Sequence, residues 1–337
     1  MPLRFVTSKQ PLRKELPCHA APPHFCPTLT GLNGLFHVHS FSGRERPSQP
    51  YAFELVLLSE QADLDMAALL HQPVFVTVNP DGTGVHGHVY GISQGPATAH
   101  GTPYTLTLVP RLAYLEHRTN QRVFQQRTVR HIIARLLKEH GMAEGDVEFR
   151  LSNVHRTRTY CVQYHETDLH FVQRLCEEEG LNYHFEHSVH GHRLVFEDGR
   201  RVSVKHSRPC ISGVQVAHVI GHGQGATRCD RHGRIKVRFH WHHASQKDAQ
   251  RCCWLPLAAG IGLPHEGMDV LVTFLDGNPD RPLIAGYLPV ALGAPTVEFH
   301  TVLRRRSTAH GTVLNEVFLA SDKPRADEPP VDYLKAG

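Results

Sequence analysis

Hydrophobic and polar residues alternate along the first third of the chain, and this alternation predicts β-strands. In YAFELVLLSE, Phe53, Leu55 and Leu57 fall on one side of a strand and the residues between them on the other. Similar runs are NGLFHVHSFSG before a glycine turn, PVFVTVNPDGTGVHGHVYGISQ with a turn at Pro80-Asp81-Gly82, and PYTLTLVPRLAYLEH. Strands at such short spacing predict an all-β barrel or sandwich over residues 31–110.

The period changes to that of α-helices after residue 110. In TVRHIIARLLKEHGM, apolar residues recur at helical spacing, Thr128 suits the N-cap, and Gly141 suits the left-handed position after the helix. TDLHFVQRLCEEEG repeats this design and ends at Gly180. Two strand patterns, LNYHFEH and HRLVFEDG, follow. Residues 111–205 are therefore predicted to form an α+β module.

Strand patterns return from residue 213. The five runs are VQVAHVIGHG, GRIKVRFHWHH, CCWLPLAAG, MDVLVTFLDG and PLIAGYLPV, which suit a small barrel such as an OB-fold over 213–292. The proline-rich residues 1–30 are predicted to be a loose extension. Residues 293–337 are predicted to be polar and irregular apart from TVLNEVFLA, with a disordered end. The predicted fold class is mainly β, with an α+β insertion.

The composition is typical of a folded globular protein and agrees with the predicted elements. Hydrophobic residues make up 40% and charged residues 20% of the 337, as in globular proteins. The net charge of +4, with Arg304-Arg305-Arg306 as the dense basic run, does not predict nucleic-acid binding. No apolar run suits a signal peptide or a membrane span. The eight cysteines form no CxxC pair and are expected to be reduced, which favours synthesis in the cytoplasm.

The 28 histidines raise the question of metal binding. In HETDLH the second histidine follows the first by five residues, one more than in a zinc-binding HExxH helix, and Thr167 as N-cap places His165 before the helix. HVH (37–39) and HGH (86–88) each place two imidazoles on one strand face, but the sequence names no third ligand. We therefore expect structural or surface roles for both pairs.

DRHGRIKVRFHWHH (230–243) ends with three histidines in its last four residues. An apolar row of alternate residues runs from Ile235 to Trp241, so we interpret the whole segment as a strand whose apolar side faces the core. A nucleophile at Cys252–Cys253 is left open, although no known motif surrounds the pair. Glu177–Glu179 lie at the C-terminal end of a helix, where the helix dipole disfavours negative charge. We interpret them as an interaction face and not as an acid–base pair.

No Walker A, dinucleotide-binding or nucleophile-elbow motif is present. The sequence thus predicts no catalytic, cofactor-binding or metal-ligating residue, and a protein that is not an enzyme. A metal-dependent hydrolase that uses the clustered histidines is the alternative.

Five segments occur in a fixed order: FSGRERPSQPYAFELVLLSE, VFQQRTVRHIIARLLKEHG, YCVQYHETDLHFVQRLCEEEGLNYHFEH, DRHGRIKVRFHW and GNPDRPLIAGYL. Together they resemble the VgrG family, the spike proteins of type VI secretion systems, which are related to the hub and spike of contractile phage tails. The resemblance covers residues 33–200 and 213–290. It implies that residues 31–110 form a β-barrel of the hub type and that the OB-fold forms the base of a spike.

The resemblance implies a structural role. The protein would form a homotrimer that caps a tube of Hcp-like subunits, carries a PAAR-type tip protein and effectors, and leaves the cell through the type VI machine without a signal peptide. No stable membrane insertion is expected. We expect the main structural residues to be Gly43 and Glu45 in a turn, and Gly233, Trp241, Pro279, Asp280 and Gly286 in the OB-fold.

The sequence departs from the family pattern between the module and the OB-fold. Relatives carry a second hub barrel there, whereas about a dozen residues separate EDGRR from VQVAHV here. Relatives also continue into a long β-helical needle, of which TVLRRRSTAHGTVLNEVFLASDK resembles only the approach, and no effector extension follows. A hub remnant that does not assemble is therefore a third interpretation.

Overall fold

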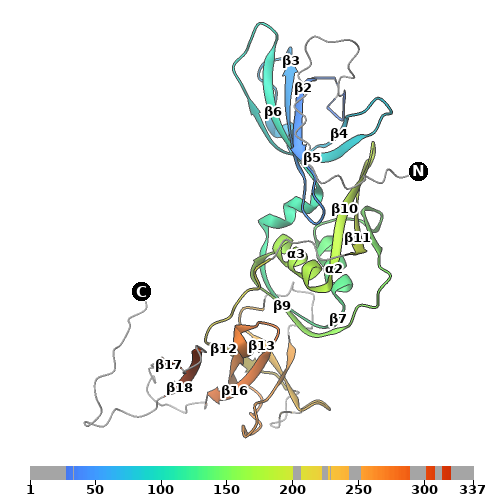
Figure 1. Ribbon diagram of the computed structural model, residues 1–337. Helices are drawn as coiled ribbons and strands as arrows, with labels where there is room; N and C mark the ends of the chain where they lie inside the picture. The colour runs from blue at the N-terminus through green and yellow to red at the C-terminus, as the bar shows by residue number, and fades with distance from the viewer. Residues whose placement is uncertain are drawn as a thin grey trace. The chain divides into compact units, whose positions relative to one another are not determined.

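The computed structural model describes residues 28–32, 34–199, 206–221, 227, 229–242 and 252–288, and two strands within 301–319 (Figure 1). The chain divides into two compact units, 1–288 and 289–337, which are described separately. The fold is mainly β, with few helices, and this confirms the predicted fold class. The boundaries of the five predicted segments stay a prediction.

The smaller unit contains an antiparallel hairpin of β17 (Thr301–Ser307) and β18 (Val313–Leu319). The expectation of an irregular segment is wrong for TVLRRRS, because this stretch pairs along its whole length with β18. The end PRADEPPVDYLKAG lies outside the described residues.

The first part of the larger unit is a six-stranded antiparallel sheet in the order β1-β4-β5-β6-β3-β2. Its strands are β1 (Thr28–Thr30), β2 (His37–Arg44), β3 (Ala52–Ser59), β4 (Pro73–Thr77), β5 (Gly84–Gln94) and β6 (Thr102–Val109), with the four-residue helix α1 (Met66–Leu69) between β3 and β4. Phe53, Leu55 and Leu57 are buried in β3, as the alternation predicts. The hairpin turn at Pro80-Asp81-Gly82 is also confirmed.

Three predictions for this sheet need correction. Thr28–Thr30 pairs with β4, so the proline-rich extension already contains a strand. Strand β2 continues through Gly43 to Arg44, because it pairs with β3 over that length, so Gly43 lies in a strand and not in a turn. Strand β6 stops at Val109, since Pro110 cannot donate to a ladder, and RLAYLEH forms the 3-10 helix η1 (Arg111–His117).

The α+β module combines two small sheets and two helices. β7 (Thr119–Arg127) pairs with β9 (Arg158–Thr167), and the second sheet has the order β10-β11-β8, from β10 (Leu181–Ser188), β11 (Gly191–Asp198) and β8 (Val147–Arg150). Helices α2 (Val129–Glu139) and α3 (Asp168–Glu179) begin at Thr128 and Thr167, whose side chains accept hydrogen bonds from backbone N–H groups of the first turn. Gly141 and Gly180 have positive φ after these helices, as predicted.

The small barrel contains five antiparallel strands in the order β14-β13-β12-β15-β16. They are β12 (Val214–Val219), β13 (Arg234–Phe239), β14 (Cys253–Pro256), β15 (Asp269–Phe274) and β16 (Pro282–Leu288). A parallel bridge between Leu257 and Ile284 joins the two outer strands, so the sheet closes on itself. Closure with one parallel contact between the third and fifth strands is the topology of an OB-fold.

The histidine-rich segment is only partly a strand. Ile235, Val237 and Phe239 are buried, which confirms the apolar face of β13. The strand ends at Phe239, however, and His240 and Trp241 form a turn, while His243 lies outside the described residues. The interpretation of the whole segment as one strand is therefore wrong at its histidine end. Across the described residues, no helix is both long and apolar enough to span a membrane.

Candidate functional site: the junction between the α+β module and the small barrel

The GNPDRP turn of the small barrel is attached to the module. Pro279 occupies the turn that the Arg281 N–H closes on the Asn278 carbonyl at 2.9 Å, where its fixed φ is favourable. The next residue, Asp280, accepts a hydrogen bond from the backbone N–H of Val162 in β9 at 2.7 Å. Burial raises the pKa of Asp280, while this hydrogen bond acts in the opposite direction. The turn thus connects two elements that are distant in sequence.

A second attachment joins β7 to β14. The side-chain amide of Gln125 donates to the carbonyl of Trp254 and accepts from its N–H, both at 2.9 Å. This pair of bonds reproduces what a neighbouring strand would offer to an edge residue. Gln125 therefore satisfies backbone groups of β14 that would otherwise need another partner.

Aromatic side chains fill the space between these two attachments. Trp241 stacks on Phe239 with ring centroids 4.6 Å apart and meets the edge of Tyr164 from β9 at 5.5 Å. Tyr160 packs against the barrel core and places its hydroxyl 3.8 Å from the sulfur of Cys253. Trp241 is only partly buried and packs against the barrel core from its rim.

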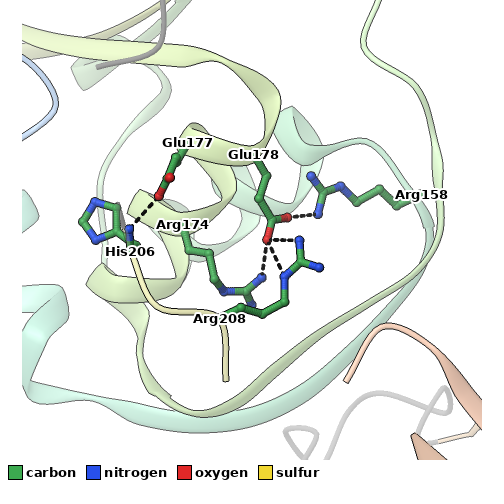
Figure 2. A pocket seen from close by; sticks show the side chains of 6 residues that line it. All are labelled: Arg158, Arg174, Glu177, Glu178, His206 and Arg208. Carbon is green, nitrogen blue, oxygen red and sulfur yellow. Dashed lines mark hydrogen bonds and ion pairs between the residues drawn. The ribbon is translucent and has the colours of Figure 1, made fainter. Parts of the chain in front are cut away.

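The acidic end of α3 forms the third attachment (Figure 2). Glu178 accepts hydrogen bonds from Arg158 of β9 at 2.6 Å, from Arg174 at 3.0 Å and from Arg208 at 2.6 Å. Burial raises the pKa of Glu178, but the Arg158 hydrogen bond and the Arg174 charge outweigh it and lower the pKa. Arg208 belongs to the segment that enters β12, so this ionic cluster fixes the approach to the barrel.

Two neighbouring glutamates complete this cluster. Glu177 accepts the backbone N–H of His206 at 2.6 Å, and Glu179 pairs with Arg158 at 2.8 Å. Three adjacent carboxylates at a helix C-terminus are tolerated because cations and N–H groups surround them. The predicted interaction face is thus an internal one, between parts of the same chain.

Asp168 holds the module itself together. Its side chain is fully buried and accepts from Arg118 and Arg122, both at 2.6 Å, and from His140 at 2.7 Å. Burial alone would raise its pKa, but the Arg122 charge and hydrogen bonds lower the pKa to about 2. These bonds connect α3 with β7 and with the end of α2. The carboxylate is structural, because each oxygen is already occupied.

The four other predicted structural residues are Gly43, Glu45, Gly233 and Gly286, and their environments differ. A Cβ added to Gly43 would lie 2.3 Å from a ring carbon of Phe53, so only glycine fits this close approach of β2 to β3. Gly233 has φ +70° in the turn before β13. Gly286 shows no such need, since its added Cβ would be 3.9 Å from Leu271. Glu45 lies 3.7 Å from the His187 ring.

The candidate metal and nucleophile residues lie in several separate parts of the fold. His37 and His39 are exposed on β2. His86 and His88 face further histidines of β10 and β11, but across the described part of the chain no group of three or more His, Cys, Asp or Glu is arranged to hold a metal ion. Burial raises the pKa of Cys253 to about 12, which makes this thiol a poor nucleophile at neutral pH.

Residues 44–238 match the family model described as the phage tail baseplate hub (GPD). The chain belongs to this family. The match includes strands β3 to β6 of the first sheet, the whole module and the start of the small barrel, and therefore contains both β9 and α3 of the junction.

This hub-family chain is also homologous to type VI secretion spike proteins. VgrG4b of Pseudomonas aeruginosa is 29% identical over 491 residues, covering 89% of the chain and 61% of the relative. VgrG5 of the same organism is 28% identical over 451 residues, covering 79% and 57%. The chain thus spans about six tenths of the length of these curated relatives. The alignment with VgrG4b is longer than the chain of 337 residues, so VgrG4b contains long segments that have no counterpart in this chain.

A solved structure shows the same fold. The Escherichia coli c3393 protein, a type VI secretion component with structural similarity to the T4 bacteriophage tail proteins gp27 and gp5, aligns with a TM-score of 0.68. The two chains are 20% identical, and the alignment covers 78% of this chain and 99% of the other.

Sequence reasoning found some junction residues and missed others. It singled out Pro279 and Asp280, but not their contact with Val162. It missed Gln125 and Arg158, which lie in strands to which no pattern had been assigned. The sequence gives no signal that Gln125 bonds Trp254, which is 129 residues away, or that Arg158 pairs with the glutamates at the end of α3.

Proposed function

We propose that the chain is a structural subunit at the base of a type VI secretion spike. It assembles as a homotrimer, its hub part sits on a tube of Hcp-like subunits, and it carries a PAAR-type tip protein and effectors. After synthesis in the cytoplasm the type VI machine exports it. The observation that carries the proposal is the direct attachment of a hub-family module to a closed small barrel through Asp280, Gln125 and the Glu178 cluster. A subunit that transmits force between tube and tip needs such a buried connection.

Exposed apolar residues support assembly. Six large hydrophobic side chains are exposed among the described residues, and four belong to the small barrel and its loops: Val214, Leu263, Leu275 and Tyr287. Tyr287 lies on β16 with 43% of its surface exposed. Aromatic residues of this kind are enriched at protein interfaces, so the barrel offers a surface for further copies of the chain.

The hub of this subunit is shortened. The chain passes from β11 at Asp198 to β12 at Val214 where relatives would insert a second hub barrel. The length of the VgrG4b alignment supports this internal difference. The trimer would then present three hub sheets to the tube, whereas a trimer of relatives with a second hub barrel would present six hub substructures.

The test is the absolute mass in solution, by light scattering after size exclusion with EDTA present. Three times the chain mass of 37.8 kDa is expected for the wild type. Tyr287→Arg should reduce this mass to one chain, whereas Val189→Arg, at the equally exposed Val189 of the β10–β11 turn, should leave it unchanged. A wild-type monomer would favour a hub remnant that does not assemble, and metal retained after dialysis would favour the hydrolase.

A further inference from the structure

Four histidines meet where the first sheet contacts the α+β module. His86 and His88 come from β5, His187 from β10 and His192 from β11. The ring centroids of His86, His88 and His192 lie 5.2 to 5.8 Å from one another. His86 and His192 are buried, and only 6% of the His187 side chain is exposed. Both β10 and β11 contact β5, so these imidazoles form part of the joint itself.

Each hydrogen bond in this cluster requires a neutral imidazole nitrogen as acceptor. The backbone N–H of His86 donates to Nδ1 of His187, and the backbone N–H of Arg111 donates to Nε2 of His192, both at 3.2 Å. His192 then carries its proton on Nδ1 and donates it to Nδ1 of His86 at 3.0 Å. A proton added to any of these acceptors would place two donors face to face.

We propose that this cluster is an acid-sensitive latch: neutral imidazoles hold the β10–β11 hairpin on β5, and their protonation releases the hairpin from the first sheet. The inference rests on the geometry of the joint and not on the proposed spike function.

The surroundings favour the neutral state at neutral pH. Burial, together with the neighbouring histidines, lowers the pKa of His86 and of His88 to about 4. Burial, with smaller effects of the neighbouring histidines and Arg111, lowers the pKa of His192 to about 2. Because the folded pKa values lie below that of a free imidazole, this contribution to stability is complete above pH ~6.5 and is lost as the pH falls toward about 4.

Charged groups around the cluster act in both directions. The guanidinium of Arg111 on η1 and the imidazole of His71 after α1 oppose protonation of His88, whereas Asp146 favours it. Glu45, after β2, is 3.7 Å from Nε2 of His187 and would stabilise a positive charge there. The hydroxyl of Tyr51, before β3, donates to the His86 carbonyl and carries no charge. Glu45 and Asp146 are two carboxylates, each near one imidazole, and Arg111 opposes Asp146 at His88, so they do not balance protonation of the whole cluster, and acid opens the joint.

Hydrogen–deuterium exchange by mass spectrometry on the full chain tests the latch. Backbone protection, corrected for the intrinsic pH dependence of exchange, is compared at pH ~7.5 and ~4.5. Amides of β5, β10 and β11 should lose protection roughly tenfold or more, because more than one imidazole binds a proton on opening. Amides of β13 and β15 serve as the internal reference and should lose much less.

Variants of the cluster distinguish its contribution from the effect of acid on the stability of the whole protein. In the double variant His86→Gln and His192→Gln, the glutamine side chains still offer hydrogen-bond acceptors, but two titrating groups are removed. The acid-induced loss of backbone protection in β5, β10 and β11 should therefore be only a few-fold. The control is His37→Gln on exposed β2, which should respond as the wild type does. If the double variant does not fold, His88→Gln replaces it, since Nδ1 of His88 has no hydrogen-bond partner among the described residues. An unchanged response of these variants, or equal loss in β13 and β15, would overturn the latch.

Discussion

The carboxylate of Asp280 accepts a 2.7 Å hydrogen bond from the backbone N–H of Val162, which lies 118 residues earlier in the chain. The N–H group of a buried strand residue is thereby satisfied by a turn of another substructure. Loss of this acceptor would leave the N–H unpaired, and an unpaired buried donor is unfavourable.

Asp280→Ala should therefore lower the free energy of unfolding by about 1–3 kcal/mol. Urea unfolding followed by tryptophan fluorescence is a suitable measurement, because Trp241 and Trp254 both lie at the junction. The matched control is Asp276→Asn, in the same loop, with a side chain that is 84% exposed and a φ of +57°, which asparagine adopts as readily as aspartate. Its ion pair with Arg281 is on the surface, and its loss should change stability by less than about 0.5 kcal/mol. Equal effects of the two substitutions would contradict the role of Asp280.

Gln125→Glu should be more harmful than Gln125→Ala, although it is closer in shape. The glutamate keeps the acceptor for the Trp254 N–H but loses the donor to the Trp254 carbonyl, and two oxygens then face each other. We expect a loss of about 1–2 kcal/mol for alanine and more for glutamate, measured by urea unfolding. Gln94→Ala, at the exposed end of β5, should have no measurable effect. A glutamate variant as stable as the wild type would rule out the double hydrogen bond.

Trp241→Ala should lower the unfolding free energy by about 2–3 kcal/mol, less than for a fully buried tryptophan, because Trp241 is only partly buried. Trp241→Phe should lower it by less than about 1 kcal/mol. Phenylalanine keeps the contact with Phe239, and it removes an indole Nε1 that has no hydrogen-bond partner within the described ranges. Differential scanning calorimetry distinguishes the two variants. Similar losses for both would mean that the indole N–H contributes through a bond to residues outside those ranges.

Gly43→Ala and Gly286→Ala form a matched pair in two strands. The added methyl at residue 43 would overlap Phe53 and the Ala52 carbonyl, so we expect a loss of about 1–3 kcal/mol. The methyl at residue 286 meets only ordinary contact, so its effect on the monomer should be within about 0.5 kcal/mol of zero. Chemical unfolding of both variants at low concentration gives the comparison. A strong effect at Gly286 would point to a close approach of another copy.

Asp168→Asn should lower stability by about 3 kcal/mol at neutral pH, because it removes the fully buried counter-charge of Arg122 and leaves that guanidinium paired with the more exposed Glu139. The folded pKa of Asp168, about 2, lies below the usual aspartate value, so its contribution is complete above pH ~4 and declines as the pH falls toward 2. The difference between wild type and variant should therefore shrink in this window, as followed by thermal unfolding. The exposed Asp63→Asn variant should show no such convergence.

The sequence by itself determined the local elements that carry strong periodic patterns. Thr128, Thr167, Gly141 and Gly180 mark the ends of α2 and α3, because capping groups and left-handed glycines act within one helical turn. The alternation around Leu55 likewise gives the buried face of β3. Five ordered segments were sufficient for the family, and the family model confirms it.

Only the tertiary structure decided how distant segments meet. Nothing in VHGHVY indicates that His192 and His187 face it, and nothing in the acidic end of α3 indicates Arg208. Strand limits were also decided by pairing: β2 runs through Gly43 because β3 continues beside it, and β13 stops before Trp241. Local propensity acts over a few residues, whereas a hydrogen bond between side chains more than 100 residues apart depends on the closed chain path. The junction and the histidine cluster therefore required the folded molecule.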